Sequence, residues 1–165
     1  YIVHRLDKET SGVLIIAKTR EYAQLFTSLF RIRKIHKTYL AIVHGNVSKS
    51  KKILIDNLIT FEKNKKLIQK AITHVKVIKS SDNYSFLELN PITGRKHQLR
   101  KQLYNIGNPI IGDEKYFLYK NMKVKYKKRV LMLHAYKIKF MINNVQYNFK
   151  AKYNEFFTEF LKSKI

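Results

Sequence analysis

The sequence predicts an α+β fold, in which a mainly antiparallel mixed sheet is flanked by helices. Strand-like segments outnumber helix-like ones, and the two kinds do not alternate one for one along the chain, as a parallel sheet would require. The 165 residues contain two Pro and five Gly, and no stretch is rich enough in either to serve as a linker. We therefore expect residues 1–165 to form a single domain.

The first third of the chain is expected to hold a strand, a helix and a second strand. Residues 13–17 form a short apolar run that is typical of a strand. Thr19 can cap a following helix, whose apolar side chains recur at helical spacing: Tyr22, Leu25, Phe26, Leu29 and Phe30. Residues 37–44 are typical of a strand with apolar residues on both faces, and Gly45 ends it.

The middle third is expected to hold three more strands and a helix. The strand candidates are residues 53–61, 71–78 and 84–89. Pro91 and Gly94 then interrupt the chain before a helix predicted over residues 96–106. Its buried stripe is Leu99, Leu103 and Ile106, and Gly107 is suited to end it.

The last third is expected to form a hairpin followed by an amphipathic helix. Residues 131–140 alternate as a strand does, and residues 145–151 return as its partner. Asn143 and Asn144 suit the tight turn between them, because Asn tolerates positive φ. The final helix gathers Tyr153, Phe156, Phe157, Phe160 and Leu161 on one face, with Glu155 at its start and Lys162 and Lys164 at its end.

The composition excludes several classes of protein and favours a polyanionic partner. There are 34 Lys and Arg against 11 Asp and Glu, a net charge of +23, while 45% of residues are hydrophobic, unlike a disordered basic tail. No apolar run is long enough for a transmembrane helix. With no Cys there is no disulfide scaffold, and a reducing, cytoplasmic location is expected. Nucleic acid is the first candidate partner and an anionic membrane surface the second, although part of the Lys excess is what an AT-rich genome produces.

The first segment that could carry chemistry is residues 4–12. Five of its nine residues are ionisable, and the segment ends in Gly. A carboxylate at Asp7, among Arg5, Lys8 and His4, would be held ionised, which suits a nucleophile better than a general acid. On spacing alone, an ordinary turn in which Asp7 caps backbone N–H groups is the simpler interpretation.

The second segment is residues 93–100, at the start of the predicted helix. Arg95, Lys96, His97 and Arg100 crowd a helix N-terminus, where the backbone dipole favours anions. Arg100 has the planar fork that binds a carboxylate or phosphate through two hydrogen bonds. The alternative is a solvated basic helix face. A phosphate-binding P-loop is excluded because no Gly-Lys-Ser/Thr follows.

The remaining clusters concern basic and histidine residues. The segment 120–129 carries Lys123, Lys127, Lys128 and Arg129 together with Tyr126, and Tyr119 directly precedes it. It is either a loop that follows RNA phosphates or a solvated loop, and the sequence favours neither. The six histidines lack the paired spacing with Glu of a zinc-protease helix, so we predict no metal site.

Five blocks, in order along nearly the whole chain, resemble the RluA-type pseudouridine synthases. They are HRLDKETSGVL at 4–14, KTYLA at 37–41, PITGRKHQLR at 91–100, GDEKY at 112–116 and LMLHA at 131–135. The resemblance implies a pseudouridine-synthase-like catalytic domain that isomerises uridine in RNA. It implies large-subunit ribosomal RNA first, tRNA as an alternative within the family, and a non-catalytic RNA-binding remnant as an alternative of another class.

The resemblance also assigns roles to single residues. It implies that Asp7 is the catalytic aspartate, that Tyr39 stacks on the target base and assists proton removal from C5, and that Arg100 pairs with Asp7 and orients it. It implies that Arg5 enters the space left by a flipped base. RNA-binding residues are then expected to include Arg5, Arg95, His97, Gln98, Lys123, Lys127, Lys128 and Arg129, in a chain that acts as a monomer without a cofactor.

The sequence departs from the family pattern at three places. Lys101-Gln102-Leu103 follows Arg100, where the family commonly has a small apolar residue and His, and Phe117 stands where Gly is usual. Full-length members also carry a strand, and often an S4-like RNA-binding domain, before the HRLD motif. We therefore expect this chain to be a catalytic domain whose N-terminal part is incomplete.

Overall fold

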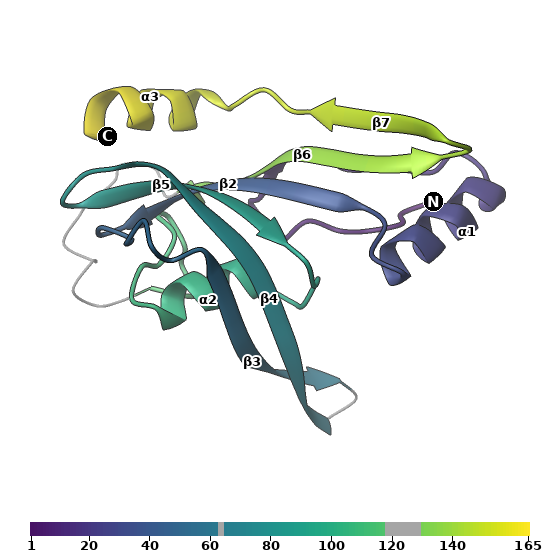
Figure 1. Ribbon diagram of the computed structural model, residues 1–165, viewed down its shortest axis with the longest axis horizontal. Helices are drawn as coiled ribbons and strands as arrows, with labels where there is room; N and C mark the ends of the chain where they lie inside the picture. The colour runs from purple at the N-terminus through teal and green to yellow at the C-terminus, as the bar shows by residue number, and fades with distance from the viewer. Residues whose placement is uncertain (63–64, 118–129) are drawn as a thin grey trace.

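The computed structural model describes residues 1–62, 65–117 and 130–165, which form one mixed sheet with three helices (Figure 1). The strands are β1 (Ser11–Gly12), β2 (His36–His44), β3 (Ile53–Glu62), β4 (Lys65–Ser80), β5 (Tyr84–Pro91), β6 (Leu133–Ile142) and β7 (Val145–Lys150). The helices are α1 (Arg20–Arg31), α2 (Gln98–Asn105) and α3 (Glu155–Lys164). The predicted α+β class is confirmed.

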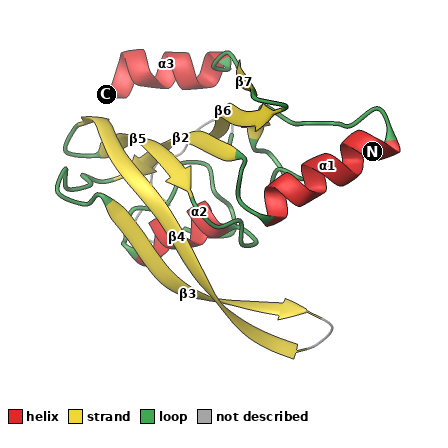
Figure 2. Ribbon diagram, turned by 45° about the vertical axis from the view of Figure 1, so that its right-hand side comes forward, coloured by secondary structure: helices red, strands yellow, loops and turns green. Residues whose placement is uncertain are grey.

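The sheet follows the order β1-β6-β2-β5-β4-β3, with β7 also paired to β6. Only β1 runs parallel to its neighbour, and every other pairing among the described strands is antiparallel. The two-residue strand β1 pairs with β6 at His134 and Ala135. Strand β7 pairs with the following part of β6, from Lys137 to Ile142. In Figure 2 the hairpin of β3 and β4 projects away from the rest of the sheet.

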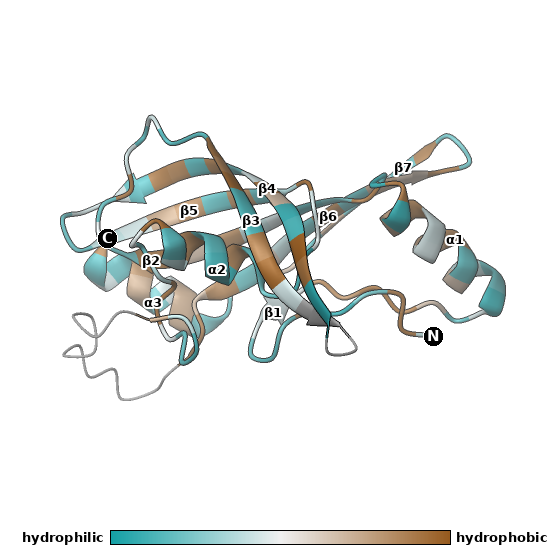
Figure 3. Ribbon diagram, turned by 90° about the horizontal axis from the view of Figure 1, so that it is seen from below, coloured by the Kyte–Doolittle hydropathy of each residue, from teal (hydrophilic) through white to brown (hydrophobic). Residues whose placement is uncertain are grey.

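Helices cover both faces of the sheet. Helix α3 lies on one face and α2 on the other (Figure 1), and the view from below in Figure 3 brings α2 to the near face. Leu103 of α2 and Phe157 of α3 are fully buried in the same core cluster as the central residues of β2. Helix α1 packs apart from them, over a smaller cluster in which Phe26 meets Phe140 edge to face. The cavity of the candidate active site lies between these two clusters.

Several local predictions are confirmed by backbone geometry. The Thr19 side chain accepts a hydrogen bond from the Tyr22 N–H and caps α1. Asn143 and Asn144 turn the β6–β7 hairpin at φ of 49° and 61°, and Gly107 follows α2 at φ of 81°. Of the seven predicted strands, the six after the first are present with shifted ends.

Residues 13–17 do not form the predicted strand. Val13 still donates its N–H to Ala135 O at 2.8 Å, but the chain then leaves the sheet, and Ile16 makes only an isolated bridge to Ile2. Ala17 is buried beside Phe26 of α1. Val13 and Ile15 pack against the same cluster, whereas Leu14 and Ile16 are exposed. Alternate residues of this run are therefore buried under a helix, and over five residues the pattern cannot be distinguished from burial in a strand.

Three element ends also differ from the prediction. Strand β4 begins at Lys65, although its first residues are polar, because they pair with β3 in the projecting hairpin. Helix α2 begins at Gln98, since His97 has a left-handed φ of 54°. Tyr153 precedes α3, which is capped by the Asn154 side chain.

The short strand β1 requires glycine. Gly12 has φ of 116°, and a Cβ at this position would overlap the backbone of Ala135 on β6. Only glycine lets the two backbones approach so closely at this φ. Because Gly12 lies five residues after Asp7, this contact fixes where the Asp7 segment leaves the sheet.

None of the described helices has the length and apolar character to cross a membrane.

Gly12→Ala should lower the free energy of unfolding by about 3 kcal/mol or more, because backbone strain is added to a steric overlap with β6. Gly107→Ala is the matched control. Gly107 also has positive φ, but no atom lies near its Cβ position, so about 1 kcal/mol is expected. Urea denaturation measures both, and equal losses would contradict the close approach.

Candidate active site

A cavity of about 630 Å³ opens between the Asp7 segment, the end of α1, strand β2 and the loop that joins β5 to α2. It collects six of the residues that the sequence singled out: Arg5, Asp7, Tyr39, Arg95, His97 and Gln98. Arg100 lies behind them and reaches Asp7 from α2. Lys123, Lys127, Lys128 and Arg129 lie outside the described residues.

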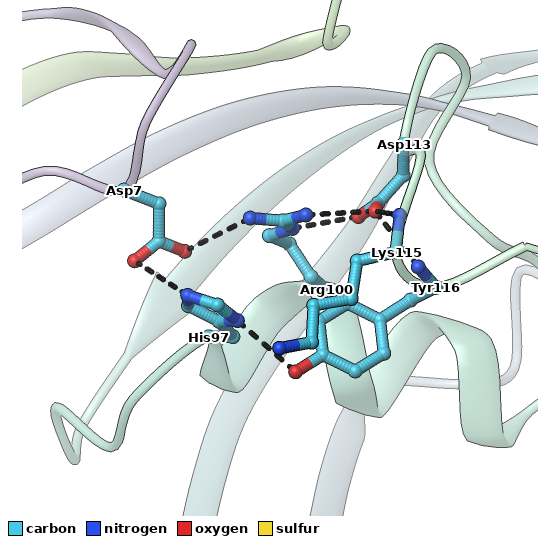
Figure 4. Close-up of polar contacts among 6 residues, drawn as sticks. All are labelled: Asp7, His97, Arg100, Asp113, Lys115 and Tyr116. Carbon is cyan, nitrogen blue, oxygen red and sulfur yellow. Dashed lines mark hydrogen bonds and ion pairs between the residues drawn. The ribbon is translucent and has the colours of Figure 1, made fainter.

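The strongest polar contact of the site joins Arg100 to Asp113. The Arg100 guanidinium donates from Nε and Nη2 to the two carboxylate oxygens of Asp113, at 2.7 and 2.8 Å (Figure 4). Both side chains are buried. Asp113 also accepts the backbone N–H groups of Lys115 and Tyr116 at 2.9 Å. This carboxylate is therefore fully used, and it fixes the orientation of the Arg100 fork.

Asp7 stands at the free end of this fork. Its carboxylate lies 4.0 Å from Nη1 of Arg100 and 3.9 Å from Nε2 of His97, which is ion-pair distance rather than hydrogen-bond distance. The side chain is 23% exposed, toward the cavity. Arg100 makes an ion pair with Asp7, but its short hydrogen bonds go to Asp113. The Asp7 oxygens thus keep their hydrogen-bonding capacity for a ligand.

His97 links the Asp7 carboxylate to Tyr116. Its Nδ1 lies 3.0 Å from the Tyr116 hydroxyl, and the guanidinium carbon of Arg100 stands 5.2 Å above the Tyr116 ring. Burial lowers the pKa of His97, and Arg100 adds to this effect while Asp7 opposes it. The left-handed backbone of His97 aims its ring back at Asp7 rather than along the helix.

Tyr39 faces the same cavity from β2. Burial, and then the neighbouring Asp7 carboxylate, raise the pKa of Tyr39 to about 12. The phenol is therefore neutral near pH 7 in the free chain. It offers a ring face and a hydroxyl group, and it is a poor base until something in the site changes its surroundings.

Gln98 and Arg95 line the cavity but are engaged within the protein. Gln98 accepts from the Thr93 hydroxyl and the Arg95 N–H, and its amide donates to Ile72 O and to the Thr73 hydroxyl. Arg95 donates from Nε to a backbone oxygen of β4 at 3.3 Å. These bonds hold the β5–α2 loop against β4, so the contribution of Gln98 that the geometry supports is to shape the loop.

Gln102, the departure from the family pattern, belongs to the same network. It is fully buried, accepts a 2.6 Å hydrogen bond from the Thr73 hydroxyl and donates to Asp56 at 2.9 Å. An amide with both ends satisfied can replace another polar side chain at this position without a buried unpaired group. The substitution thus ties α2 to the projecting hairpin and leaves Arg100 in place.

His4 fixes the segment that carries Asp7. Its Nε2 accepts the Ile15 backbone N–H at 2.8 Å, and its ring lies 4.8 Å from that of Phe30. Burial, and then the neighbouring Lys37 ammonium, lower the pKa of His4 to about 4. A neutral ring is also what this hydrogen bond requires, because an imidazolium has no acceptor nitrogen.

Reasoning from the sequence missed Asp113, which holds Arg100 in place, and three of the six basic residues that line the cavity. Asp113 stood in a family block without a role, and its place directly after Gly in a turn was the only signal. Arg31 and Arg33 carried no local signal, and Lys37 stood in the block KTYLA without a role. Folding alone brings the three together. The basic residues lining the cavity are Arg5, Arg31, Arg33, Lys37, Arg95 and Lys96, against the single carboxylate of Asp7. In the described part of the chain no three His, Asp or Glu residues gather as a metal site.

Comparison with known proteins identifies the family. A family model described as RNA pseudouridylate synthase matches residues 1–105. Ribosomal large subunit pseudouridine synthase D of Borreliella burgdorferi is 38% identical over 98% of this chain and 49% of its own. Ribosomal large subunit pseudouridine synthase C of Rickettsia felis is 37% identical over 96% of this chain and 54% of its own. The tRNA pseudouridine synthase C of Haemophilus ducreyi is 35% identical over 81% of this chain and 63% of its own.

Solved structures agree with the sequence relatives. Human RNA pseudouridylate synthase domain containing 4 superimposes with a TM-score of 0.78 at 27% identity, over 98% of this chain and 74% of that one. Human RNA pseudouridylate synthase domain containing 1 has the same TM-score at 24% identity, over 92% of this chain and 68% of that one. This second likeness supports the fold. The chain spans about half the length of the first curated relatives it matches. It belongs to the RNA pseudouridylate synthase family, as the five blocks predicted.

Asp113→Ala should lower the free energy of unfolding by about 3–5 kcal/mol, because it leaves a buried guanidinium and two backbone N–H groups without their acceptor. Glu159→Ala, at an exposed position of α3, is the control and should change stability by less than about 0.5 kcal/mol. Chemical denaturation followed by circular dichroism measures both. A loss at Asp113 as small as that of the control would contradict the anchoring role.

Stability should fall with acid in a way that depends partly on His4. Its folded pKa, about 4, lies below the ordinary 6.5, so the unfolded chain takes up the proton first as pH falls. The His4 contribution is therefore complete above about pH 6.5 and is lost toward pH 4. His4→Gln keeps an acceptor for Ile15 but cannot titrate. The drop in unfolding free energy between pH 7 and pH 5 should be smaller in this variant, and an unchanged drop would contradict the assignment.

Proposed function

We propose that this member of the RNA pseudouridylate synthase family isomerises uridine to pseudouridine, with large-subunit ribosomal RNA as its substrate. The observation that carries the proposal is the position of Asp7, the one carboxylate among the described residues that line a cavity rich in arginine and lysine. Such a cavity attracts a polyanion and presents a single anionic nucleophile to it. The net charge of +23 supports the same partner.

In the proposed reaction Asp7 attacks the target nucleotide. The bond between uracil N1 and the ribose C1′ breaks and the uracil rotates. C5 then bonds to C1′, and the bond between Asp7 and the nucleotide breaks, which returns the free carboxylate. The C5 proton passes by way of the Tyr39 hydroxyl to water and N1 takes up a proton, so that the product has the same atoms as uridine. The Asp7 oxygens accept no hydrogen bond within the described structure and face the cavity, so they can reach a nucleotide without first losing a partner. Arg100 stands at 4.0 Å, where it favours the ionised carboxylate without blocking it.

Tyr39 and Arg5 are proposed to hold the base and the RNA. A target atom in stacked RNA becomes reachable only when the nucleotide is flipped out of the stack. The ring of Tyr39 offers a stacking surface inside the cavity, and stacking on an aromatic face suits an unpaired pyrimidine. Arg5 is exposed at the rim, where a side chain can fill the space that the flipped nucleotide leaves.

The second candidate substrate is tRNA. It is favoured by the relative from Haemophilus ducreyi, which is named a tRNA pseudouridine synthase and is 35% identical over 81% of this chain. The ribosomal candidate is placed first because two relatives named for the large subunit match at 37–38% over 96–98% of the chain. Incubating the chain with unmodified transcripts of both RNAs and mapping pseudouridine chemically distinguishes the two.

Asp7→Ala should abolish release of tritium from C5-labelled uridine in RNA, lowering the rate by more than about 1,000-fold, because the nucleophile is removed. RNA affinity should survive, since the cations of the cavity remain. Asp82→Ala, an exposed carboxylate after β4, is the control and should keep the parent rate. Release by Asp7→Ala as fast as by the parent would overturn the assignment of Asp7. A parent that binds RNA without forming pseudouridine would favour a binding protein.

A further inference from the structure

Lys37 is a cation inside the cavity that the proposed reaction does not use. It lies near the start of β2, two residues before Tyr39, and lines the cavity together with His4 and Tyr39. Its Nζ reaches across to the β5–α2 loop, where it would stand 3.6 Å from a Cβ at Gly94. The Cβ of any other residue at position 94 would thus contact this amine, whereas glycine leaves the space beside the amine open.

The Lys37 amine has no protein partner within the described structure. Among residues 1–62, 65–117 and 130–165, no carboxylate pairs with it and no acceptor receives its hydrogen bonds. Asp7, the one carboxylate among the described residues that line the cavity, faces His97 and Arg100 instead. Burial lowers the pKa of Lys37, as expected for an ammonium that has lost water without gaining an acceptor.

An unpaired, partly buried cation costs stability, so its presence in a cavity suggests that a ligand supplies the missing anion. The uracil and ribose of a uridine nucleotide are neutral, whereas the phosphodiesters on either side of it are charged. A lysine ammonium binds phosphate as a point charge, without the fixed geometry that a carboxylate–arginine pair needs. The ligand chemistry that fits this corner of the cavity is therefore a phosphodiester.

We propose that Lys37, beside the open position at Gly94, forms the subsite for a phosphate that flanks the flipped uridine. The inference rests on the proposed function, because it takes RNA as the ligand, and it adds a residue that positions the nucleotide while Asp7 acts on it. Lys37 then sets how deep the nucleotide enters the cavity. The role is in binding rather than in bond breaking.

The test is the salt dependence of binding to a short oligouridylate, measured by fluorescence anisotropy. Each phosphate neutralised on a single strand contributes about −0.7 to the slope of log K against log salt. Lys37→Met should therefore give a slope that is less steep by about 0.7, whereas Lys37→Arg should keep the parent slope. Lys162→Met, on the exposed last turn of α3, is the control and should also keep it. A contact to a neutral uracil oxygen would release no counterion and leave the slope unchanged.

Equal slopes for the parent and Lys37→Met would overturn the proposal, as would a parent that does not bind the oligonucleotide. An equal change in Lys162→Met would also overturn it, because the effect would then be one of net charge. Thermal melts keep the result interpretable, since removing an unpaired buried charge should not unfold the chain. The readout is independent of catalysis. A changed slope in a chain that forms no pseudouridine would keep the subsite and reject the proposed reaction.

Discussion

The paired hydrogen bonds between Arg100 and Asp113 set the geometry on which the site depends. A guanidinium at the buried end of α2 has many rotamers, and only a fixed partner makes its remaining N–H group point in one direction. Asp113 supplies that partner, and it is itself fixed by the N–H groups of Lys115 and Tyr116. The free Nη1 is left facing Asp7. Two carboxylates thus share one arginine, with one anchored and the other available.

The rest of the fold brings the second carboxylate to this arginine. Gly12 lets the chain pass close to β6, and His4 accepts the Ile15 N–H, so the segment between them is held at both ends. The cavity that forms around Asp7 is lined by cations from α1, β2 and the β5–α2 loop. Its electrostatics therefore arise from residues far apart in sequence, and Asp7 is the one carboxylate among the described residues that line it.

The sequence predicted most of the local structure, and six of the site residues that it singled out line one cavity. Turns and caps were predictable because single residues determine them, as Asn143, Asn144 and Thr19 do. Residues 13–17 were misassigned because an apolar run has the same pattern under a helix as in a strand. The role of Asp113 and the convergence of Arg31, Arg33 and Lys37 depend on the sheet order, which no local pattern carries. Family resemblance pointed to Asp7 and Arg100, but their separation of 4.0 Å required the structure.

The orientation of Arg100 by Asp113 is tested most directly by a double-mutant cycle on the rate of the proposed pseudouridine formation. The variants are Arg100→Gln, Asp113→Asn and the two combined, assayed at a temperature at which all remain folded. If Asp113 works by orienting Arg100, the double variant should be no slower than the slower single variant, because the second change removes nothing that is left. Losses that multiply in the double variant would show that the two residues act independently, and would contradict the arrangement described.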